Sequence, residues 1–334
     1  MTDLKTNYLG LELKNPLVAA ASALSKKSST IKKMEDAGIS AVVMYSLFEE
    51  QITHDSLAFN YYMERGTERF AESLDYFPNL DRYNVGPEEY LERIRKNKEG
   101  VDIPVIASLN GVSNSGWIDY AQKMAEAGAD ALELNTYYIL TNPEITASEL
   151  EDNYVALVSA VCKHVDIPVS VKLSPFFSAL PNLAERLVDA GADGLVLFNR
   201  FIQPDIDIER MEVDATLHLS TSEELLLPLR WTALLYGRID ADLALTSGVH
   251  TGVDLVKAVM AGANVAMVAS EFIANGVERA TEILAEMENW MAAYDHSAVA
   301  KMRGSMSQQH VENPAAFERA NYMKALQSYD NKLP

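Results

Sequence analysis

The sequence predicts an α/β fold, a (β/α)8 TIM barrel, from three observations. Four segments end a helix and begin a strand in nearly the same letters, "MEDAGISAVVMYS", "MAEAGADALELNT", "LVDAGADGLVLFN" and "VMAGANVAMVASE". Two more strands share the lead "VDIPV", in which proline ends the preceding element and β-branched residues follow. The apolar runs are nearly continuous, which is typical of parallel strands that are buried on both faces.

Eight apolar runs appear in order, each followed by a segment of helical periodicity. The first is "NPLVAAAS" and the seventh is "ADLALTSG", and the segments named above supply the other six. Eight such units predict one closed barrel, and the alternative is a doubly wound open sheet. At the four repeated joints an Ala-Gly pair stands where the end of a helix needs a residue that tolerates left-handed backbone. The glycines of these pairs are Gly38, Gly128, Gly191 and Gly262.

Two regions depart from a minimal barrel. The connection from Leu47 to about Gly86, after the second strand, is far longer than a usual loop and is rich in aromatic residues, which indicates a lid or a site-building excursion. Beyond Trp290 the runs "SAVAKMRGSMSQQ" and "PAAFERANYMKAL" are compatible with helices. We therefore expect a barrel domain over residues 1–290 and a C-terminal helical extension over residues 291–334 that packs on it.

The composition excludes several classes of protein. The 334 residues carry 28 Lys and Arg against 48 Asp and Glu, a formal charge of −20, so the basic surface that nucleic-acid binding needs is missing. The N-terminus has no basic segment followed by an apolar one, and no apolar run is long enough to span a bilayer. We expect a cytoplasmic protein with a small-molecule substrate and with no nucleic-acid partner, membrane partner or metal. A homodimer is compatible with the sequence, which leaves the oligomeric state open.

In a barrel of this kind the chemistry lies at the carboxyl-terminal ends of the strands, and here those ends are unusually polar. Alternation along the fourth strand places Glu133 and Asn135 on one face and the leucines between them on the other. Leucines suit the side that faces the helices, so we expect the acid and the amide inside the barrel. The residues at the eight strand ends are Ser22, Tyr45, Ser46, Asn110, Glu133, Asn135, Lys172, Ser174, Asn199, Ser247, Gly248 and Ser270.

A second expectation concerns charge inside the barrel. Ser170, Lys172 and Ser174 share a face of the fifth strand by the same alternation. Because an unpaired buried charge is very unfavourable, we expect Glu133 to pair with Lys172. The alternative is an internal ion pair that stabilises the barrel without any catalytic role.

The last two strands end in segments that predict a phosphate site. "TSGVHTG" and "VASEF" supply small residues and backbone N–H groups at helix starts, where the helix dipole favours a phosphate group. A phosphate at one edge, a lysine on strand five, and amides on strands three, four and six suit a planar heterocycle with many hydrogen-bonding edges. Flavin mononucleotide (FMN) fits this description, and the lysine would favour negative charge on the reduced ring.

An ordered set of motifs between about residues 5 and 290 resembles the dihydroorotate dehydrogenases, particularly the soluble class 1 type. The motifs are "NPLVAAASAL", "PVIASLNG", "ALELN", "PVSVKLSP", "LVLFNR" and "LTSGVHTGVDLVKAVMAGANVAMVAS". The resemblance implies an FMN-binding barrel that oxidises dihydroorotate to orotate in pyrimidine biosynthesis. A base near the substrate would remove one proton while the flavin accepts hydride from the neighbouring carbon.

The resemblance also implies roles for individual residues. Lys172 matches the lysine that contacts the flavin, and we expect it to act in catalysis. The substrate contacts that we expect are Asn79, Asn135 and Asn199. The cofactor contacts that we expect are Ser22, Ser46, Asn110, Asn135, Lys172, Asn199, Ser247, Gly248, Ala269 and Ser270.

Two tyrosines depart from the family pattern. After the fourth-strand asparagine the family runs Leu-Ser-Cys-Pro-Asn, with Cys or Ser as the base, whereas this chain runs Thr-Tyr-Tyr-Ile-Leu. Tyr138 stands where the base is expected, and the following asparagine is lost unless Asn142 replaces it. Tyr45 stands in place of a lysine, which removes a cation from the site. A phenol, with an ordinary pKa of about 10, can act as an acid or base if a nearby cation lowers that pKa, and Lys172 is the candidate cation.

The sequence therefore predicts an FMN-dependent oxidoreductase of dihydroorotate dehydrogenase type, with Tyr138 and Lys172 as its catalytic residues. Its substrate would be dihydroorotate or a related compound that can be dehydrogenated. One alternative is an FMN-binding barrel with an altered substrate or lost catalysis. Another is a lyase or isomerase that keeps the phosphate site and binds no flavin.

Overall fold

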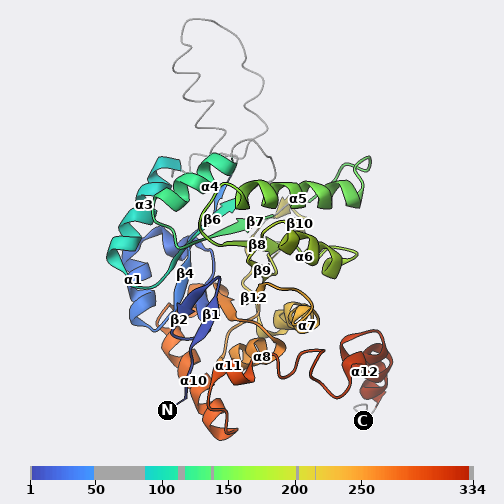
Figure 1. The fold of residues 1–334 in the computed structure, drawn as a ribbon. Coiled ribbons are helices and arrows are strands. Elements are labelled where there is room, and N and C mark those ends of the chain that lie inside the picture. Colours follow the sequence, from blue (N-terminus) through green and yellow to red (C-terminus); the bar gives the residue numbers. More distant parts are fainter. Residues whose placement is uncertain are drawn as a thin grey trace, which may run out of the picture.

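Eight parallel strands close into a barrel in the computed structural model, which describes residues 2–48, 87–111, 117–136, 139–200, 203–214 and 216–330 (Figure 1). Each strand pairs with the next along the chain, and the eighth pairs with the first. This closure confirms the predicted barrel and excludes the open sheet. The strands are β3 (Leu17–Ala19), β4 (Ala41–Val43), β6 (Val105–Asn110), β7 (Ala131–Asn135), β8 (Val169–Leu173), β9 (Gly194–Leu197), β12 (Asp242–Thr246) and β13 (Val265–Val268).

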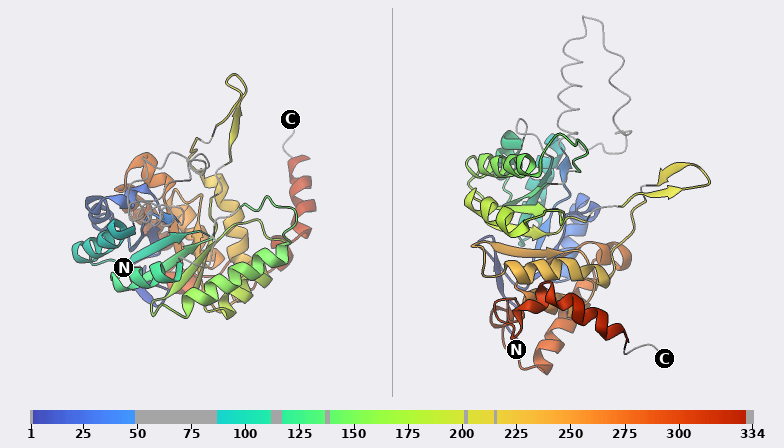
Figure 2. Two further views of the ribbon diagram at one scale, coloured as in Figure 1. Left: turned by 90° about the horizontal axis from the view of Figure 1, so that it is seen from above. Right: turned by 90° about the vertical axis from the view of Figure 1, so that its right-hand side faces the viewer.

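Helices follow the strands and surround the sheet (Figure 2). Local signals set several of their ends: α5 begins at a capping box in which Thr146 and Glu149 satisfy each other's backbone N–H groups. The helices are α1 (Ser28–Asp36), α3 (Pro87–Gly100), α4 (Trp117–Glu126), α5 (Ala147–Cys162), α6 (Leu180–Asp189), α7 (Leu226–Leu235), α8 (Gly252–Ala261), the short α9 (Ser270–Asn275) and α10 (Arg279–Ala293).

The four repeated Ala-Gly joints behave as expected. Gly38, Gly128, Gly191 and Gly262 have φ angles of 99°, 94°, 109° and 126°, in the region that side chains disfavour. Each glycine lets the chain leave a helix and enter the next buried strand within a few residues. The repeated letters of the sequence are therefore the repeated turn of the barrel.

Two apolar layers form the core. One layer lies between strands and helices and contains Leu132 and Leu134 of β7. The other fills the barrel interior with side chains such as Val43 and Met267. A hairpin of β1 (Thr6–Tyr8) and β2 (Leu11–Leu13) adds Tyr8 and other side chains to this inner layer, near the amino-terminal ends of the strands. The interior is thus packed from one end, which leaves the carboxyl-terminal end for a site.

Several segments extend beyond the barrel. After β9, a hairpin of β10 (Asp205–Asp207) and β11 (Glu212–Asp214) projects from the body (Figure 2). A short strand, β5 (Leu47–Phe48), pairs with β6, and a 3-10 turn, η4 (Ser222–Leu225), precedes α7. The long connection predicted from Leu47 to Gly86 lies, beyond residue 48, outside the described residues.

The C-terminal segment contains α11 (Val299–Met302), the 3-10 turn η5 (Pro314–Phe317) and α12 (Ala320–Asp330). Its first part joins the barrel helices, since the amides of Gly304 and Gln308 donate to carbonyls of α8 and α7. The boundary after residue 290 stays a prediction, and α10 runs through it to Ala293. Within the described residues, no helix combines the length and the apolarity needed to cross a membrane.

Candidate functional site

A cavity of about 290 Å³ opens at the carboxyl-terminal ends of the strands. Its walls come from the ends of β3, β8, β9, β12 and β13 and from the loops that follow them. Polar groups on separate strands converge there, as in ligand sites of other barrels. The residues predicted from the sequence that line this cavity are Ser22, Lys172, Asn199, Ser247, Gly248, Ala269 and Ser270.

The turn after β12 requires its glycine. Ser247 and Gly248 have φ angles of 79° and 77°, so two successive residues adopt left-handed backbone. A Cβ atom on Gly248 would lie 2.1 Å from the backbone nitrogen of Leu225, inside the volume of η4. The turn therefore packs directly on η4 and presents its backbone to the cavity. The first amide of α8, at Gly252, donates instead to Glu286 over 2.7 Å.

Lys172 and Glu133 form the predicted ion pair inside the barrel. The Nζ atom of Lys172 lies 3.6 Å from Oε1 of Glu133, and their side chains are 8% and 0% exposed. The strand register also agrees with the prediction, since Leu132 and Leu134 lie in the layer that faces the helices. Neither carboxylate oxygen of Glu133 has a hydrogen-bond donor among the described residues. In the described part of the chain, Lys172 is the cation that pairs with this buried charge, and it also lines the cavity.

Amides lie beside the cavity. The Nδ2 atom of Asn199 donates to Oδ1 of Asn135 over 2.7 Å, which links the loop after β9 to the end of β7. Asn110 pairs with Asn135 in the register between β6 and β7. Ser46 does not line the cavity, and its hydroxyl lies 2.8 Å from that of Ser108 on β6. The structure therefore brings Asn135 and Asn199 together and places Asn110 and Ser46 farther along the row of strand ends.

Tyr45 points away from the cavity. Its ring packs edge-on against Tyr90 of α3, with centroids 5.1 Å apart, in the layer between strands and helices. Burial raises the pKa of Tyr45 to about 12. Its hydroxyl has no hydrogen-bond partner among the described residues. The substitution at this position therefore removes a cation without placing a phenol in the site.

Three other predicted residues do not join the described site. Tyr138 and Asn79 fall outside the described residues. Asn142 is exposed, and its side chain accepts a hydrogen bond from the backbone N–H of Glu144 within its own turn. Among the residues that the structure describes, no group of three or more His, Cys, Asp or Glu side chains is arranged to hold a metal ion.

The sequence prediction missed three polar residues of the cavity, Thr246 at the end of β12, Ser220 and Arg200. Ser220 lies in the segment before η4, and its backbone N–H donates to Oγ of Ser270 over 3.1 Å. Arg200 lies one residue beyond Asn199 and forms a two-pronged ion pair with Glu224, at 2.9 and 3.1 Å. Arg200 could have been found from its place after a strand end, whereas Ser220 stands in a long connection with no local signal.

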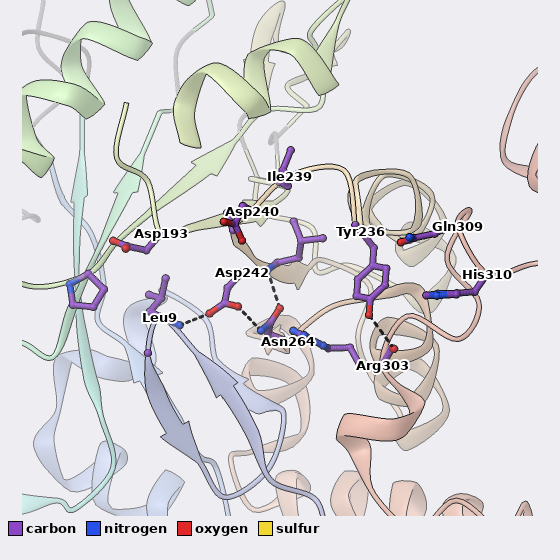
Figure 3. Close-up of a pocket in the computed structure, with 16 residues that line it drawn as sticks. Leu9, Asp193, Tyr236, Ile239, Asp240, Asp242, Asn264, Arg303, Gln309 and His310 are labelled. Carbon is purple, nitrogen blue, oxygen red and sulfur yellow. Dashed lines mark hydrogen bonds between the residues drawn. The ribbon is translucent and has the colours of Figure 1, made fainter. Parts of the chain in front are cut away.

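A second cavity, of about 600 Å³, lies at the opposite, amino-terminal end of the strands (Figure 3). Asp242 accepts hydrogen bonds from the backbone N–H of Leu9 over 2.7 Å and from the Asn264 side chain over 2.6 Å. Asp193 accepts from the backbone N–H of Val169 over 2.8 Å. These side chains bind the chain's own backbone, as is usual at the stabilising end of a barrel. The larger cavity is therefore the weaker candidate for a site.

Comparison with known proteins gives one family. The sequence profile described as "Dihydroorotate dehydrogenase" matches residues 82–291. Among curated proteins, the catalytic subunit of dihydroorotate dehydrogenase B (NAD(+)) from Methanocaldococcus jannaschii is 28% identical over 281 residues, which cover 80% of this chain and 86% of that protein. The subunit of the same name from Thermoplasma acidophilum is 28% identical over 299 residues, 87% of this chain and 94% of that protein. That from Alkaliphilus metalliredigens is 24% identical over 314 residues, 91% of this chain and 99% of that protein.

Proposed function

Because the chain belongs to the dihydroorotate dehydrogenase family, we propose that it is an FMN-dependent oxidoreductase that dehydrogenates a CH–CH bond of dihydroorotate or of a close relative. The observation that carries the proposal is the cavity at the carboxyl-terminal ends of the strands. Seven residues that were predicted from the sequence as cofactor contacts line it together. Its location at the active end of the barrel supports an enzymatic role, and membership of the family supports a role in pyrimidine metabolism.

The residues of the cavity suit the parts of FMN. Backbone and small side chains at Ser247, Gly248, Ala269 and Ser270 would hold the phosphate, and Gly248 is required because a Cβ atom there would strike η4. Lys172, from β8, would lie toward the ring. FMN would supply the chemistry of hydride acceptance.

Lys172 and the asparagines prepare the site for that chemistry. The ammonium group favours negative charge nearby, and its distance of 3.6 Å to Glu133 holds the lysine side chain within the barrel. The hydrogen bond between Asn199 and Asn135 fixes both amides at the ends of β9 and β7, the strands on either side of β8. These groups would bind and orient a planar substrate that has several hydrogen-bonding edges.

By its place in the sequence Tyr138 stands where the family has its base, and of the two substrate classes we favour a close relative of dihydroorotate over dihydroorotate itself. Tyr45 packs away from the cavity, so the site lacks the second-strand cation of the family pattern. A tyrosine needs a nearby cation to ionise near neutral pH, and Lys172, the candidate that remains, is paired with Glu133. One change of substrate accounts for both tyrosines, whereas an unchanged substrate needs two separate compensations.

The test is anaerobic reduction of the purified flavoprotein. We expect the protein to bind FMN noncovalently, to be reduced slowly by dihydroorotate, and to be reduced faster by another cyclic compound with a CH–CH bond beside a carbonyl. Tyr138→Phe should change the slow reaction little. Rapid reduction by dihydroorotate that is lost in Tyr138→Phe would instead establish a phenol base and the unchanged substrate.

Two controls separate the alternatives. A protein that is colourless and leaves the fluorescence of added FMN unchanged would support a lyase or isomerase that binds phosphate without flavin. A protein that binds FMN but is reduced by no compound of the panel would support a binding role without catalysis.

A further inference from the structure

A row of three side chains lies behind the cavity and takes no part in the function proposed above. Ser220 lines the cavity, and its Oγ lies 3.0 Å from Nε2 of His250. Nδ1 of the same ring lies 2.9 Å from Oε2 of Glu271. Ser220 is 8% exposed, and the side chains of His250 and Glu271 are 15% and 10% exposed. We call this row the serine–histidine–glutamate chain, and it connects the cavity to a carboxylate that does not line it.

Hydrogen bonds fix the Glu271 end of the serine–histidine–glutamate chain. Oε1 of Glu271 accepts hydrogen bonds from Nδ2 of Asn275 and Nε of Arg279, each over 3.0 Å. Burial opposes ionisation, but the hydrogen bonds from His250, Asn275 and Arg279 keep the pKa of Glu271 below its usual value. An ionised carboxylate only accepts hydrogen bonds, so the Nδ1 atom that faces it carries a proton.

The protonation state of Nε2, the other ring nitrogen, therefore determines whether the Ser220 hydroxyl can donate a hydrogen bond into the cavity. When Nε2 is unprotonated, the hydroxyl of Ser220 donates its hydrogen to His250 and turns only lone pairs toward the cavity. When Nε2 is protonated, it donates to Ser220, and the hydroxyl hydrogen is free to point into the cavity. One proton on His250 thus converts Ser220 from an acceptor into a donor and adds a positive charge behind it.

A positive charge behind Ser220 would strengthen phosphate binding in this cavity. Of the described residues, the cations that line the cavity are Lys172 and Arg200, and each is already paired, with Glu133 and Glu224 respectively. The amide that begins α8, at Gly252, donates to Glu286. Imidazole is the side chain whose charge changes most readily near neutral pH. His250, which contacts Ser220, is therefore the group placed to supply an additional charge.

We propose that the serine–histidine–glutamate chain is a proton-coupled clamp for the cofactor phosphate. His250 takes up one proton from solution as the phosphate binds, donates Nε2–H to Ser220, and thereby turns the Ser220 hydroxyl into a donor to a phosphate oxygen. No covalent bond forms or breaks. The inference rests on the proposed binding of FMN and adds that the serine–histidine–glutamate chain selects the phosphorylated form of the flavin. His250 and Glu271 are positioning residues, because Ser220 alone of the three lines the cavity.

Other charges surround the imidazole but do not line the cavity. The backbone N–H of His250 donates to Oδ2 of Asp254 over 3.2 Å. Their hydrogen-bonded link to a phosphate in the cavity would therefore run through His250 and Ser220. The charged groups joined to His250 directly or through one or two partners are Asp254, Lys257, Glu271, Arg279, Glu282 and Glu286.

The same geometry invites a competing explanation, because a serine, a histidine and an acid in hydrogen-bonding sequence can form a nucleophile. A serine nucleophile also needs N–H donors for the oxyanion. The backbone N–H of Ser220 already donates to Ser270. This arrangement favours the clamp over a nucleophile, and the experiment distinguishes the two.

The experiment compares FMN with riboflavin, which lacks the phosphate, by calorimetric titration of the full chain after removal of bound flavin. We expect Ser220→Ala and His250→Gln each to weaken FMN binding by about 10- to 100-fold, the range of one charge-assisted hydrogen bond, with riboflavin affinity within about twofold of wild type. The double variant should be no worse than either single variant, because both changes break one chain. Titration in buffers of different ionisation enthalpy should show proton uptake with FMN in wild type that is absent in His250→Gln. His164→Gln, on an exposed helix end, is the matched control and should change neither ligand.

Each other outcome has a definite meaning. Equal losses for FMN and riboflavin, or additive losses in the double variant, would overturn the clamp in favour of a merely structural role. Labelling of Ser220 by a fluorophosphonate probe that requires His250 would overturn it in favour of a nucleophile. Failure of the wild-type chain to bind either flavin would overturn the proposed function itself, and that result is distinct from FMN binding that ignores His250.

Discussion

The two ends of the barrel hold cavities that differ in how their polar side chains are paired. At the amino-terminal end, Asp242 and Asp193 bind backbone N–H groups and so fix the strands and the N-terminal hairpin. At the carboxyl-terminal end, side chains pair mainly with one another, as in the Asn135–Asn199 and Lys172–Glu133 contacts. A hydrogen bond from a side chain to the backbone stabilises the fold, whereas in a pair of side chains a ligand can replace one partner. The pairing of the polar side chains, and not the cavity volumes of about 600 and 290 Å³, therefore distinguishes the end that we propose to be functional.

The largest effect should come from breaking the ion pair at the carboxyl-terminal end. Lys172→Met leaves the buried Glu133 without its cation, and removing one partner of a buried pair costs about 3–5 kcal/mol of stability. The flavin should also become harder to reduce, because the charge near the ring is lost. Chemical denaturation and a redox titration measure the two effects. In the double variant Lys172→Met/Glu133→Gln, most of the stability should return while the flavin stays hard to reduce. A single variant that keeps both properties would place Lys172 away from the flavin.

Glycines of the two cavities provide a matched pair. Gly248→Ala places a Cβ atom 2.1 Å from backbone of η4 at a φ of 77°, so we expect a loss of about 3 kcal/mol and of FMN binding. Gly10 lines the amino-terminal cavity with a φ of 72°, but a Cβ atom there meets nothing within 4 Å. Gly10→Ala should therefore cost only about 1 kcal/mol and leave FMN affinity unchanged. Thermal unfolding and fluorescence titration compare the two variants. Similar FMN affinities would show that the turn at Ser247 and Gly248 does not bind the phosphate.

Substitution of Asp242 should have the opposite effect, a loss of folding stability without a loss of FMN affinity. Asp242→Asn replaces one acceptor oxygen with an NH2 group, which then faces either the backbone N–H of Leu9 or the side-chain NH2 of Asn264. The lost hydrogen bond should cost about 2 kcal/mol of stability. Asn in place of Asp240, which is exposed on the same cavity, is the control and should change little. Weaker FMN binding in Asp242→Asn would break the distinction between the two ends.

The same aspartate predicts a pH dependence. Burial raises the pKa of Asp242 above its ordinary value of 3.8, against the opposing hydrogen bonds from Leu9 and Asn264. The folded chain therefore holds this proton to a higher pH than the unfolded chain does. The stability that follows is fully present below pH 3.8 and is lost as the pH rises through the folded-state pKa. Denaturation of the Asn variant across this range should lack that component.

The smallest effect should come from Tyr45, which belongs to the core and not to the site. Its buried hydroxyl has no partner among the described residues, so Tyr45→Phe should leave stability at pH 7 and FMN affinity nearly unchanged. Tyr90→Phe is the control, since the Tyr90 hydroxyl accepts from the backbone N–H of Ser108 over 2.9 Å, and it should cost about 1 kcal/mol.

Alkaline unfolding sharpens this prediction. The pKa of Tyr45 is raised by burial from 10.0 to about 12, so its contribution to stability is present below pH 10 and is lost as the pH rises through about 12. Tyr45→Phe should flatten the stability profile in that window. A profile identical to wild type would show that the Tyr45 phenol is not buried in solution.

The sequence by itself determined the barrel and much of its functional end. The joints at Gly38, Gly128, Gly191 and Gly262 and the alternation that points Glu133 toward Lys172 are local patterns, and each needs only a few neighbouring residues to be expressed. Parallel strands then carry all their carboxyl-terminal ends to one side, so residues at the ends of β3, β8, β12 and β13 meet in one cavity.

Only the tertiary structure decided where the residues beyond the strands point. Alternation would turn Tyr45 inward with Val43, but β4 ends at Val43, and the ring packs outward against Tyr90 of α3. Ser220 and His250 are 30 residues apart and meet because the segment before η4 crosses the loop after β12. No local pattern encodes such a meeting, because it depends on the path of a long connection over a finished barrel.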